Sequence, residues 1–236
     1  MNINMNPNSE LNQSIVKVPN LVSVPDPLMK QAYQFQEAMM MYTCAIREVK
    51  TKLEVLNDEL SVRNSRNPIE LVKSRVKKPV SIVEKLKRRN LPVSLESMME
   101  NLDDVAGIRV ICSFLDDIYA VADMLARQDD VHIIAIKDYI SQPKINGYRS
   151  YHMIIEIPVF FSDQKKWMRV EVQIRTMAMD FWASLDHQLK YKKEMQEYSQ
   201  EISDELRECA DVIAQTDEKM LNIRKRIEEQ GITVTK

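Results

Sequence analysis

Two neighbouring stretches of alternating side chains constrain the fold more than any other feature of the chain. They read HMIIEI at residues 152–157 and VEVQIR at residues 170–175, with a polar turn at residues 162–166 between them. Because successive side chains of a strand point to opposite faces, each stretch has one apolar face and one face with polar groups. The pattern predicts a β-hairpin. Its polar positions include His152, Glu156, Glu171, Gln173 and Arg175.

The loop ahead of this hairpin concentrates cations and an aromatic ring. It reads KINGYRSYH from Lys144 to His152. No apolar run surrounds Tyr148, so a role in stacking on a base competes evenly with a role in packing. Cations, a ring and a histidine beside a carboxylate-bearing sheet suit a phosphorylated ligand that contains a base.

Glycine is scarce, which limits the kind of phosphate site that the chain can build. Its three glycines are Gly107, Gly147 and Gly231. A P-loop needs at least two glycines ahead of a Lys-Ser/Thr pair, and a dinucleotide fingerprint needs two or three. Nucleotide phosphates would therefore have to be held by side chains and not by a glycine-rich backbone cradle.

Composition predicts a cytoplasmic protein that does not bind nucleic acid through its overall charge. The formal net charge is −2. The longest apolar-rich run, residues 154–161, is interrupted by a glutamate and a proline and is too short to cross a bilayer. The cysteines Cys44, Cys112 and Cys209 are far apart within apolar patterns, so we expect buried thiols in a reducing compartment.

Long helices are expected at both ends of the chain. Residues 1–26 are rich in Asn, Ser and Pro and are expected to form a flexible arm. Apolar residues then recur in steps of four and three from Leu28 to Leu60, and again within a helix expected at residues 201–229. Such a seam packs either on its own domain or against a second copy, and both alternatives stay open.

The region between these helices mixes helical and strand patterns. Asn67-Pro68 joins a cap residue to a helix-starting proline, so we expect a basic helix from there to residue 89, kinked or broken at Pro79. A short helix capped by Ser94 follows. Strands are expected at residues 105–114 and 131–139, and helices at residues 116–128 and 176–193.

These elements predict an α+β fold. A mixed β-sheet of four or more strands with helical crossovers would form a core at about residues 67–193, flanked by the long N- and C-terminal helices. We expect a single domain over residues 27–236.

Two acidic residues stand where metal ligands would be expected. Asp104 precedes a buried strand, and Glu171 lies inside a strand whose opposite face is apolar. An ionised carboxylate there is costly unless a cation or hydrogen bonds compensate it, as Mg²⁺ held by carboxylates and phosphate oxygens would do. The alternative is that Asp103 and Asp104 cap a turn while Glu171 pairs with Arg169 or Arg175.

Several motifs together resemble those of the (p)ppGpp synthetases of the RelA/SpoT family. The matching segments are Asp104-Val-Ala-Gly-Ile-Arg109, Lys137-Asp-Tyr-Ile, Lys144-x-Asn-Gly-Tyr-Arg-Ser-Tyr-His152 and Glu171-Val-Gln-Ile-Arg175. The segment from Asn67 through Lys85 is similar to the family's nucleotide-binding helix. The resemblance covers roughly residues 67–193 in order. In length and C-terminal helix the chain is similar to the small, single-domain alarmone synthetases, more of the RelP than of the RelQ type.

The resemblance implies a reaction and a role for each matched residue. A nucleotidyltransferase-like core would transfer the β,γ-diphosphate of ATP to the ribose 3′-hydroxyl of GDP or GTP, with Mg²⁺ as cofactor and AMP as leaving group. Asp104 and Glu171 would act in catalysis and hold the metal. The ATP-binding residues would be Arg75, Lys77, Ser81, Lys85 and Arg109. The residues that bind GDP or GTP would be Lys137, Lys144, Asn146, Tyr148, His152, Gln173 and Arg175.

The resemblance also implies a homotetramer that needs neither membrane nor nucleic acid. Long family members carry an N-terminal hydrolase with a His-Asp pair, whereas the first histidine here is His132, so we expect no hydrolase activity. The competing hypothesis is an RNA-binding regulatory module that uses the basic run at residues 73–89 and the Tyr148 loop. RNA binding predicts a steep salt dependence and has no need of Asp104 or Glu171.

Overall fold

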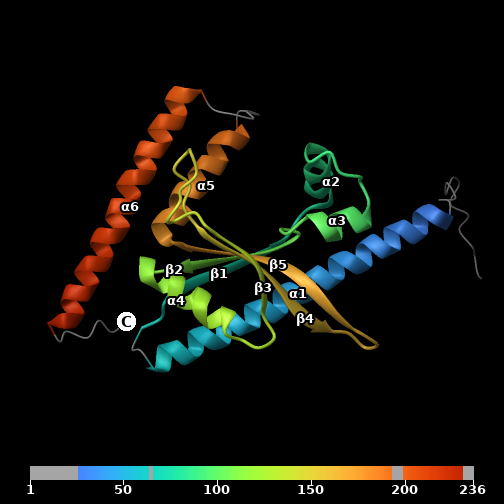
Figure 1. Cartoon of the computed structure of the whole chain (residues 1–236), viewed down its shortest axis with the longest axis horizontal. Helices are drawn as coiled ribbons and strands as arrows, with labels where there is room; N and C mark the ends of the chain where they lie inside the picture. Colours follow the sequence, from blue (N-terminus) through green and yellow to red (C-terminus); the bar gives the residue numbers. More distant parts are fainter. Residues whose placement is uncertain (1–25, 64–65, 193–198, 231–236) are drawn as a thin grey trace, which may run out of the picture.

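A five-stranded mixed sheet organises the fold (Figure 1). The computed structural model describes residues 26–63, 66–192 and 199–230 of the chain. In chain order the elements are α1 (Asp26–Arg63), β1 (Ile69–Val76), α2 (Pro79–Arg88), α3 (Leu95–Asn101), β2 (Ala106–Cys112), α4 (Leu115–Ala126), β3 (His132–Asp138), β4 (Tyr151–Phe160), β5 (Lys165–Thr176), α5 (Met177–Lys192) and α6 (Gln200–Glu229). The expected N-terminal arm lies outside the described residues except for Asp26, where α1 begins.

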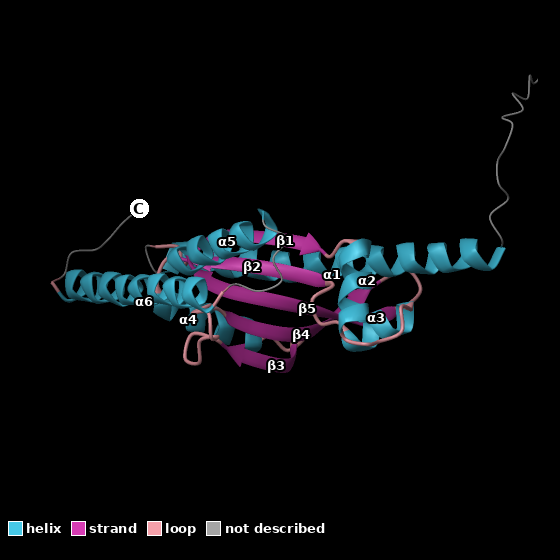
Figure 2. Cartoon of the chain, turned by 90° about the horizontal axis from the view of Figure 1, so that it is seen from above, coloured by secondary structure: helices cyan, strands magenta, loops and turns pink. Residues whose placement is uncertain are grey.

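The strand order is β1-β2-β5-β4-β3 (Figure 2). Only β2 and β5 run parallel, and the other neighbours are antiparallel. The predicted hairpin is confirmed, since β4 pairs with β5 and sets His152 opposite Gln173 and Ile154 opposite Glu171. Parallel pairing then places Gly107 of β2 beside Glu171. The predicted α+β class with a mixed sheet is confirmed.

The two faces of the sheet differ in what they pack against. One face carries the apolar side chains of β4 and β5, such as Ile155, Val170 and Val172, which are fully buried in the core together with Leu53 of α1 and Ile118 of α4. Burying each such side chain contributes roughly 1.5–3 kcal/mol. The other face is on the side of the sheet where the α2–α3 pair and the α5–α6 pair lie (Figure 1).

The segment after Pro68 is a strand where the sequence predicted a helix. β1 pairs antiparallel with β2, with Arg75 opposite Gly107. The predicted helix start is wrong, because the edge of the buried strand β2 offers backbone partners that outweigh a local capping signal. The helix begins only at Pro79, since Lys78 is extended ahead of that proline at φ −65° and ψ 144°. Pro79 starts α2 and does not kink it.

The long C-terminal helix buries only part of its apolar seam. Ala210, Leu221 and Arg224 are the buried residues of α6, whereas the seam residues Cys209 and Met220 are exposed. The helix therefore contacts the domain partly through polar groups and leaves part of its apolar seam exposed.

Smaller predictions divide between confirmed and wrong. The cap of α3 is confirmed, because Ser94 Oγ accepts a hydrogen bond from the Ser97 N–H at 3.1 Å. The expectation of three buried thiols is wrong, since Cys112 is buried, Cys44 is half-buried and Cys209 is exposed. In the described ranges, no helix has the length and apolarity that crossing a membrane requires.

Candidate active site

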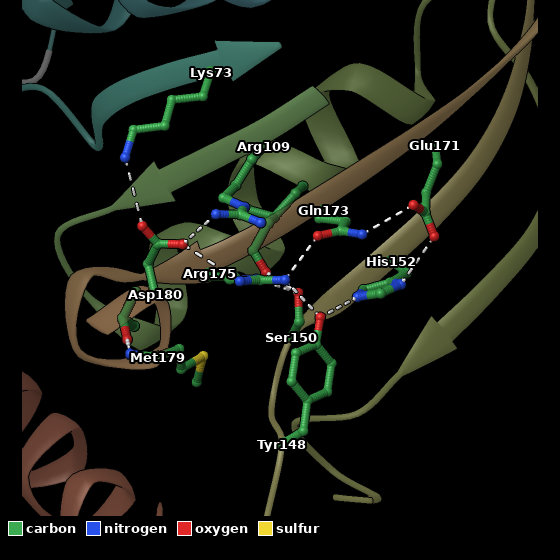
Figure 3. A network of polar contacts seen from close by, with 12 residues as sticks. Lys73, Arg109, Tyr148, Ser150, His152, Glu171, Gln173, Arg175, Met179 and Asp180 are labelled. Atoms are coloured by element: carbon green, nitrogen blue, oxygen red, sulfur yellow. Dashed lines mark hydrogen bonds and ion pairs between the residues drawn. The ribbon is translucent and has the colours of Figure 1, made fainter. Parts of the chain in front are cut away.

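A closed ring of hydrogen bonds lies on the open face of β4 and β5 (Figure 3). Arg175 Nη2 donates to Tyr148 Oη at 2.6 Å and to Gln173 Oε1 at 2.7 Å. Gln173 Nε2 donates to Glu171 Oε2 at 2.9 Å. His152 Nδ1 lies 3.3 Å from Glu171 Oε1, and His152 Nε2 lies 2.9 Å from Tyr148 Oη, which closes the ring. Strand alternation and the β4–β5 register bring these predicted residues together.

The directions of these hydrogen bonds define the state of His152. An ionised Glu171 can only accept, so Nδ1 of His152 carries the proton and Nε2 accepts from the Tyr148 hydroxyl. Burial lowers the pKa of His152, although the hydrogen bond to Glu171 and its charge act in the opposite direction. The imidazole is therefore neutral at pH 7. Two donor chains run from Arg175 to Glu171, one through Gln173 and one through Tyr148 and His152.

Glu171 is held as a carboxylate at the end of both chains. Burial alone would raise its pKa, but the hydrogen bonds from His152 and Gln173 outweigh that effect and lower it. The charge of Asp104 acts against this lowering. A carboxylate with a lowered pKa is a weak base near neutral pH and is better suited to bind a cation or to accept a hydrogen bond from a hydroxyl.

Asp104 forms a second cluster with the two lysines that were predicted to hold ATP phosphates. Its Oδ2 lies 3.0 Å from Lys77 Nζ and 2.7 Å from Lys85 Nζ. The backbone N–H of Lys77 donates to Val105 O at 2.8 Å, which fixes Lys77 beside Asp104, while Lys85 reaches over from α2. Burial would raise the pKa of Asp104, but the hydrogen bonds and charges of both lysines outweigh it and lower the pKa.

The free oxygen of Asp104 fits a metal ligand. Its Oδ1 is buried and has no hydrogen-bond partner among the described residues. A buried carboxylate oxygen without a partner is costly unless a cation completes the site. In the part of the chain that the structure describes, no three or more His, Cys, Asp or Glu gather as a metal-binding group. Asp104 and Glu171 instead fit Mg²⁺, which takes one or two carboxylates and completes its shell with water and phosphate oxygens.

Asp180, in the first turn of α5, extends the ring toward β1 and was missed by the sequence reasoning. Its carboxylate lies 3.0 Å from Arg109 Nη1, 3.3 Å from Arg175 Nη1 and 3.8 Å from Lys73 Nζ (Figure 3). Cationic side chains from β1, β2 and β5 thus converge on one carboxylate. The available signal was an acidic residue in the first turn of the helix that follows Thr176, but two of its partners, Lys73 and Arg109, lie far away along the chain.

The remaining predicted ATP residues come from α2, β1 and β2. Ser81 is half-buried in the first turn of α2, and Arg75 is exposed on β1. Arg109 stands on β2 beside Gln173 of β5 in the parallel register. The expectation that one helix carries Arg75, Ser81 and Lys85 is wrong, because Arg75 belongs to a strand.

The remaining predicted acceptor residues surround Tyr148. Lys144 Nζ lies 4.7 Å from the centroid of the Tyr148 ring and 4.6 Å from that of Tyr139. Asn146 Oδ1 accepts from the Tyr148 N–H at 3.3 Å, and Lys137 is exposed on β3 opposite His152.

Tyr148 itself is half-buried, so packing accounts for part of its position, and a role in stacking on a base stays a prediction. Tyr148 packs against Tyr139, Trp182 of α5 and its partners in the ring of hydrogen bonds, and of these Trp182 and Arg175 are distant in sequence. Burial raises the pKa of its hydroxyl, while the charge of Arg175 acts against that.

The alternative pairing of the acidic residues is wrong. Arg169 lies 3.0 Å from Asp103 and 3.4 Å from Glu156, and Arg175 reaches Glu171 only through other side chains. The basic run expected for RNA binding is also not one helix. Two of its cations, Lys77 and Lys85, are directed at Asp104, which removes the main support for that hypothesis.

Comparisons with known proteins agree with this arrangement. A family described as "Region found in RelA / SpoT proteins" matches residues 74–196. GTP pyrophosphokinase YwaC of Bacillus subtilis is 41% identical over 203 residues, which are 86% of this chain and 96% of that protein. The crystal structure of small alarmone synthetase 2 from Bacillus subtilis has a TM-score of 0.74 at 43% identity, over 81% of this chain and 98% of that one.

A second solved structure, small alarmone synthetase 1 from Bacillus subtilis bound to its product pppGpp, has a TM-score of 0.76 at 35% identity. The match covers 82% of this chain and 98% of that one. The assignment to the RelP type stays a prediction. The chain belongs to the RelA/SpoT family, and it matches small alarmone synthetases over nearly their whole length.

Proposed function

We propose that this protein is a GTP pyrophosphokinase that makes (p)ppGpp from ATP and GDP or GTP. The observation that carries the proposal is the carboxylate of Glu171, which ends the ring of hydrogen bonds on one face of the sheet. Group transfer between nucleotides depends on positioning and on neutralising phosphate charge, and both clusters supply cations for that. The similarity to a synthetase solved with pppGpp supports the same conclusion.

On the donor side, Arg75 and Arg109 sandwich the adenine while Lys77, Ser81 and Lys85 hold the phosphates. The first turn of α2, which contains Ser81, has no acidic residue, and the free N–H groups and dipole of a helix start favour anions. The phosphates compete with Asp104 for the two lysine ammonium groups. Binding of ATP therefore exchanges lysine–aspartate pairs for lysine–phosphate pairs and leaves Asp104 to hold the metal.

On the acceptor side, Tyr148 stacks on the guanine, and Lys144 and His152 contact the phosphates of GDP or GTP. Gln173 and Arg175 hold Glu171 and Tyr148 in place through the hydrogen bonds of the ring. Lys137 and Asn146 complete this subsite at the edge of β3 and in the loop.

The chemical step joins the ribose 3′-oxygen to the β-phosphorus of ATP. The bond between that phosphorus and the oxygen bridging to the α-phosphate breaks, and AMP leaves with the bridging oxygen. The proton of the 3′-hydroxyl leaves through its hydrogen bond to Glu171 and passes on to water. Mg²⁺, which Asp104 and Glu171 would hold, neutralises phosphate charge and shares in activating the hydroxyl when it is bound. Glu171 accepts the hydrogen bond of the 3′-hydroxyl and orients its oxygen. Because its pKa is lowered, Glu171 is an orienting acceptor first and a base only weakly.

The test is direct product analysis. The protein is incubated with ATP, Mg²⁺ and either GDP or GTP, and the mixture is separated by ion-exchange chromatography. We expect AMP and a guanosine tetra- or pentaphosphate to appear in equal amounts. Intact substrates over a full range of Mg²⁺ concentrations would contradict the proposal.

We further propose that the protein is a cytoplasmic homotetramer. Every fourth residue of α5 from Met177 to Leu189 is a large apolar residue between 42% and 61% exposed. Exposed apolar stripes of this kind mark association surfaces. Sedimentation velocity at micromolar concentration should show a tetramer, and a monomer would contradict the assignment.

A further inference from the structure

The loop that carries Tyr148 rests directly on α6. Backbone hydrogen bonds close it into a tight turn, with Gly147 N donating to Lys144 O at 2.8 Å and Lys144 N donating to Tyr148 O at 3.2 Å. Gly147 has φ +86°, which favours glycine. A Cβ at Gly147 would lie 2.6 Å from Ala210 Cβ and 3.1 Å from Arg207 Cα, both in α6. A side chain at position 147 would therefore push the turn away from the helix.

An ion pair fastens the loop to the same part of α6. Arg149 Nη2 donates to Asp211 Oδ1 at 2.8 Å, and Arg149 Nη1 donates to Ala210 O at 3.3 Å. The side chain of Arg149 is largely buried, while that of Asp211 is half-exposed. Arg149 also stands between Tyr148 and Ser150, and Arg175 donates to both of their hydroxyl groups. Arg149, which contacts α6, is thus flanked by two residues that are hydrogen-bonded to Arg175 of the ring.

The helix is itself fixed to the rest of the domain. Thr176 Oγ1, at the end of β5, donates to Asp217 Oδ2 at 2.6 Å. Trp182 Nε1 of α5 donates to a backbone carbonyl oxygen of α6 at 3.0 Å. Further along, the buried Arg224 pairs with Asp116 of α4. These anchors hold α6 at one position relative to the sheet, so the helix can act as a rigid support for the loop.

We propose that α6 is a positioning element for the acceptor nucleotide and that Asp211 is a positioning residue that acts through Arg149. The ion pair and the close contact at Gly147 fix the turn, and the turn fixes where the ring of Tyr148 lies above the sheet. The inference rests on the proposed function for the identity of the ligand, a guanine nucleotide.

The arrangement confines this effect to one side of the site. α6 lies beside α5 at one end of the sheet, whereas α2, which carries Ser81 and Lys85, lies at the other end (Figure 1). A change at Asp211 therefore weakens the binding of GDP or GTP and leaves the binding of ATP as it is.

The test compares Asp211→Ala with Asp116→Ala in the full chain. Each change removes a carboxylate that pairs with an arginine across a contact of α6, but only the first one touches the loop. For Asp211→Ala we expect the KM for GDP to rise about tenfold, as the loss of one charge-assisted hydrogen bond predicts, with the KM for ATP and kcat unchanged. Asp116→Ala should lower the Tm and leave both KM values unchanged. Asp211→Glu keeps the carboxylate and should restore most of the affinity for GDP.

Amide hydrogen exchange gives a second readout that needs no catalysis. Asp211→Ala should accelerate exchange at residues 144–149, whereas Asp116→Ala should not. An equal rise of both KM values, or unchanged exchange in the loop, would overturn the inference. If the wild-type protein forms no guanosine tetra- or pentaphosphate, the proposed function fails, and the exchange experiment still decides whether α6 positions the loop.

Discussion

On the donor side of the site Lys77 and Lys85 pair directly with Asp104, whereas on the acceptor side the ring from Arg175 to Glu171 is held by hydrogen bonds within itself. The donor side must exchange its ion pairs when phosphates arrive, while the acceptor side already has its side chains in place. Preorganised groups need no rearrangement at the moment of reaction, so the ring is suited to hold the nucleophile. The ion pairs of the donor cluster therefore differ between the free and the nucleotide-bound protein.

Glu171→Gln removes the carboxylate that we assign to both the metal and the 3′-hydroxyl. We expect the largest effect from this change. Loss of the charge should reduce kcat by about 10²–10³, the size seen when one preorganised group at a reacting centre is removed. Calorimetry should show ATP affinity nearly unchanged, because the donor contacts remain. The matched control is Glu156→Gln, which changes a glutamate of β4 on the same face of the sheet. This variant should stay active. A fully active Glu171→Gln variant would discard the assignment.

Asp104→Asn distinguishes the two roles proposed for Asp104, which are pairing with the lysines and holding the metal. The change removes the charge that binds Lys77 and Lys85, so we expect kcat to fall by about 10², from the loss of a metal-holding carboxylate, while the KM for ATP does not rise. The Mg²⁺ concentration for half-maximal activity should increase. Asp103→Asn, which affects only the pair with Arg169, is the control. If the KM for ATP rises and the Mg²⁺ dependence stays normal, Asp104 does not compete with the ATP phosphates for the two lysines.

Tyr148→Phe opens the acceptor ring at one hydroxyl. Arg175 loses an acceptor and His152 loses a donor, which we expect to cost about 1 kcal/mol and to raise the KM for GDP roughly fivefold. The KM for ATP should stay the same. Tyr119→Phe, which removes a hydroxyl that contacts Asp138, is the control. Equal changes in both KM values would show that the ring serves both nucleotides.

The smallest expected effect is a pH dependence of stability that His152 causes. Burial lowers its pKa below the ordinary 6.5, so the unfolded chain takes up a proton first as the pH falls. The contribution is fully present above about pH 6.5 and is lost as the pH falls from there toward the lowered pKa. Urea unfolding between pH 5 and 8 should show that the free energy of unfolding depends less steeply on pH in His152→Gln than in the wild type, and an unchanged dependence would contradict this role of His152.

The parts of the fold that the sequence predicted are those with a strong local period. Alternation in β4 and β5 identified the hairpin and placed Glu171, Gln173 and Arg175 in one row. The steps of four and three likewise predicted α1 and α6. β1 was missed because it is an exposed edge strand without regular alternation, and its structure depends on pairing with β2.

The arrangement of the site was harder to predict than these elements, because it depends on contacts between distant segments. Tyr148 is covered by Tyr139 from the turn after β3, by Trp182 of α5 and by the ring, and a local pattern around residue 148 does not show these contacts. The role of Asp180 depends on cations from three strands. The pairing of Asp104 with both lysines likewise follows from β1 being a strand, which brings Lys77 to the start of β2.

The division of the site into a donor side and an acceptor side can be tested most directly by calorimetry with two variants. A non-hydrolysable ATP analogue and GDP are each titrated into the wild type, Lys85→Ala and Tyr148→Ala. The account predicts that Lys85→Ala weakens only the ATP analogue and that Tyr148→Ala weakens only GDP, each about tenfold, as the loss of one charged or stacking contact would cause. Weakening of both ligands by either variant to the same extent would contradict it.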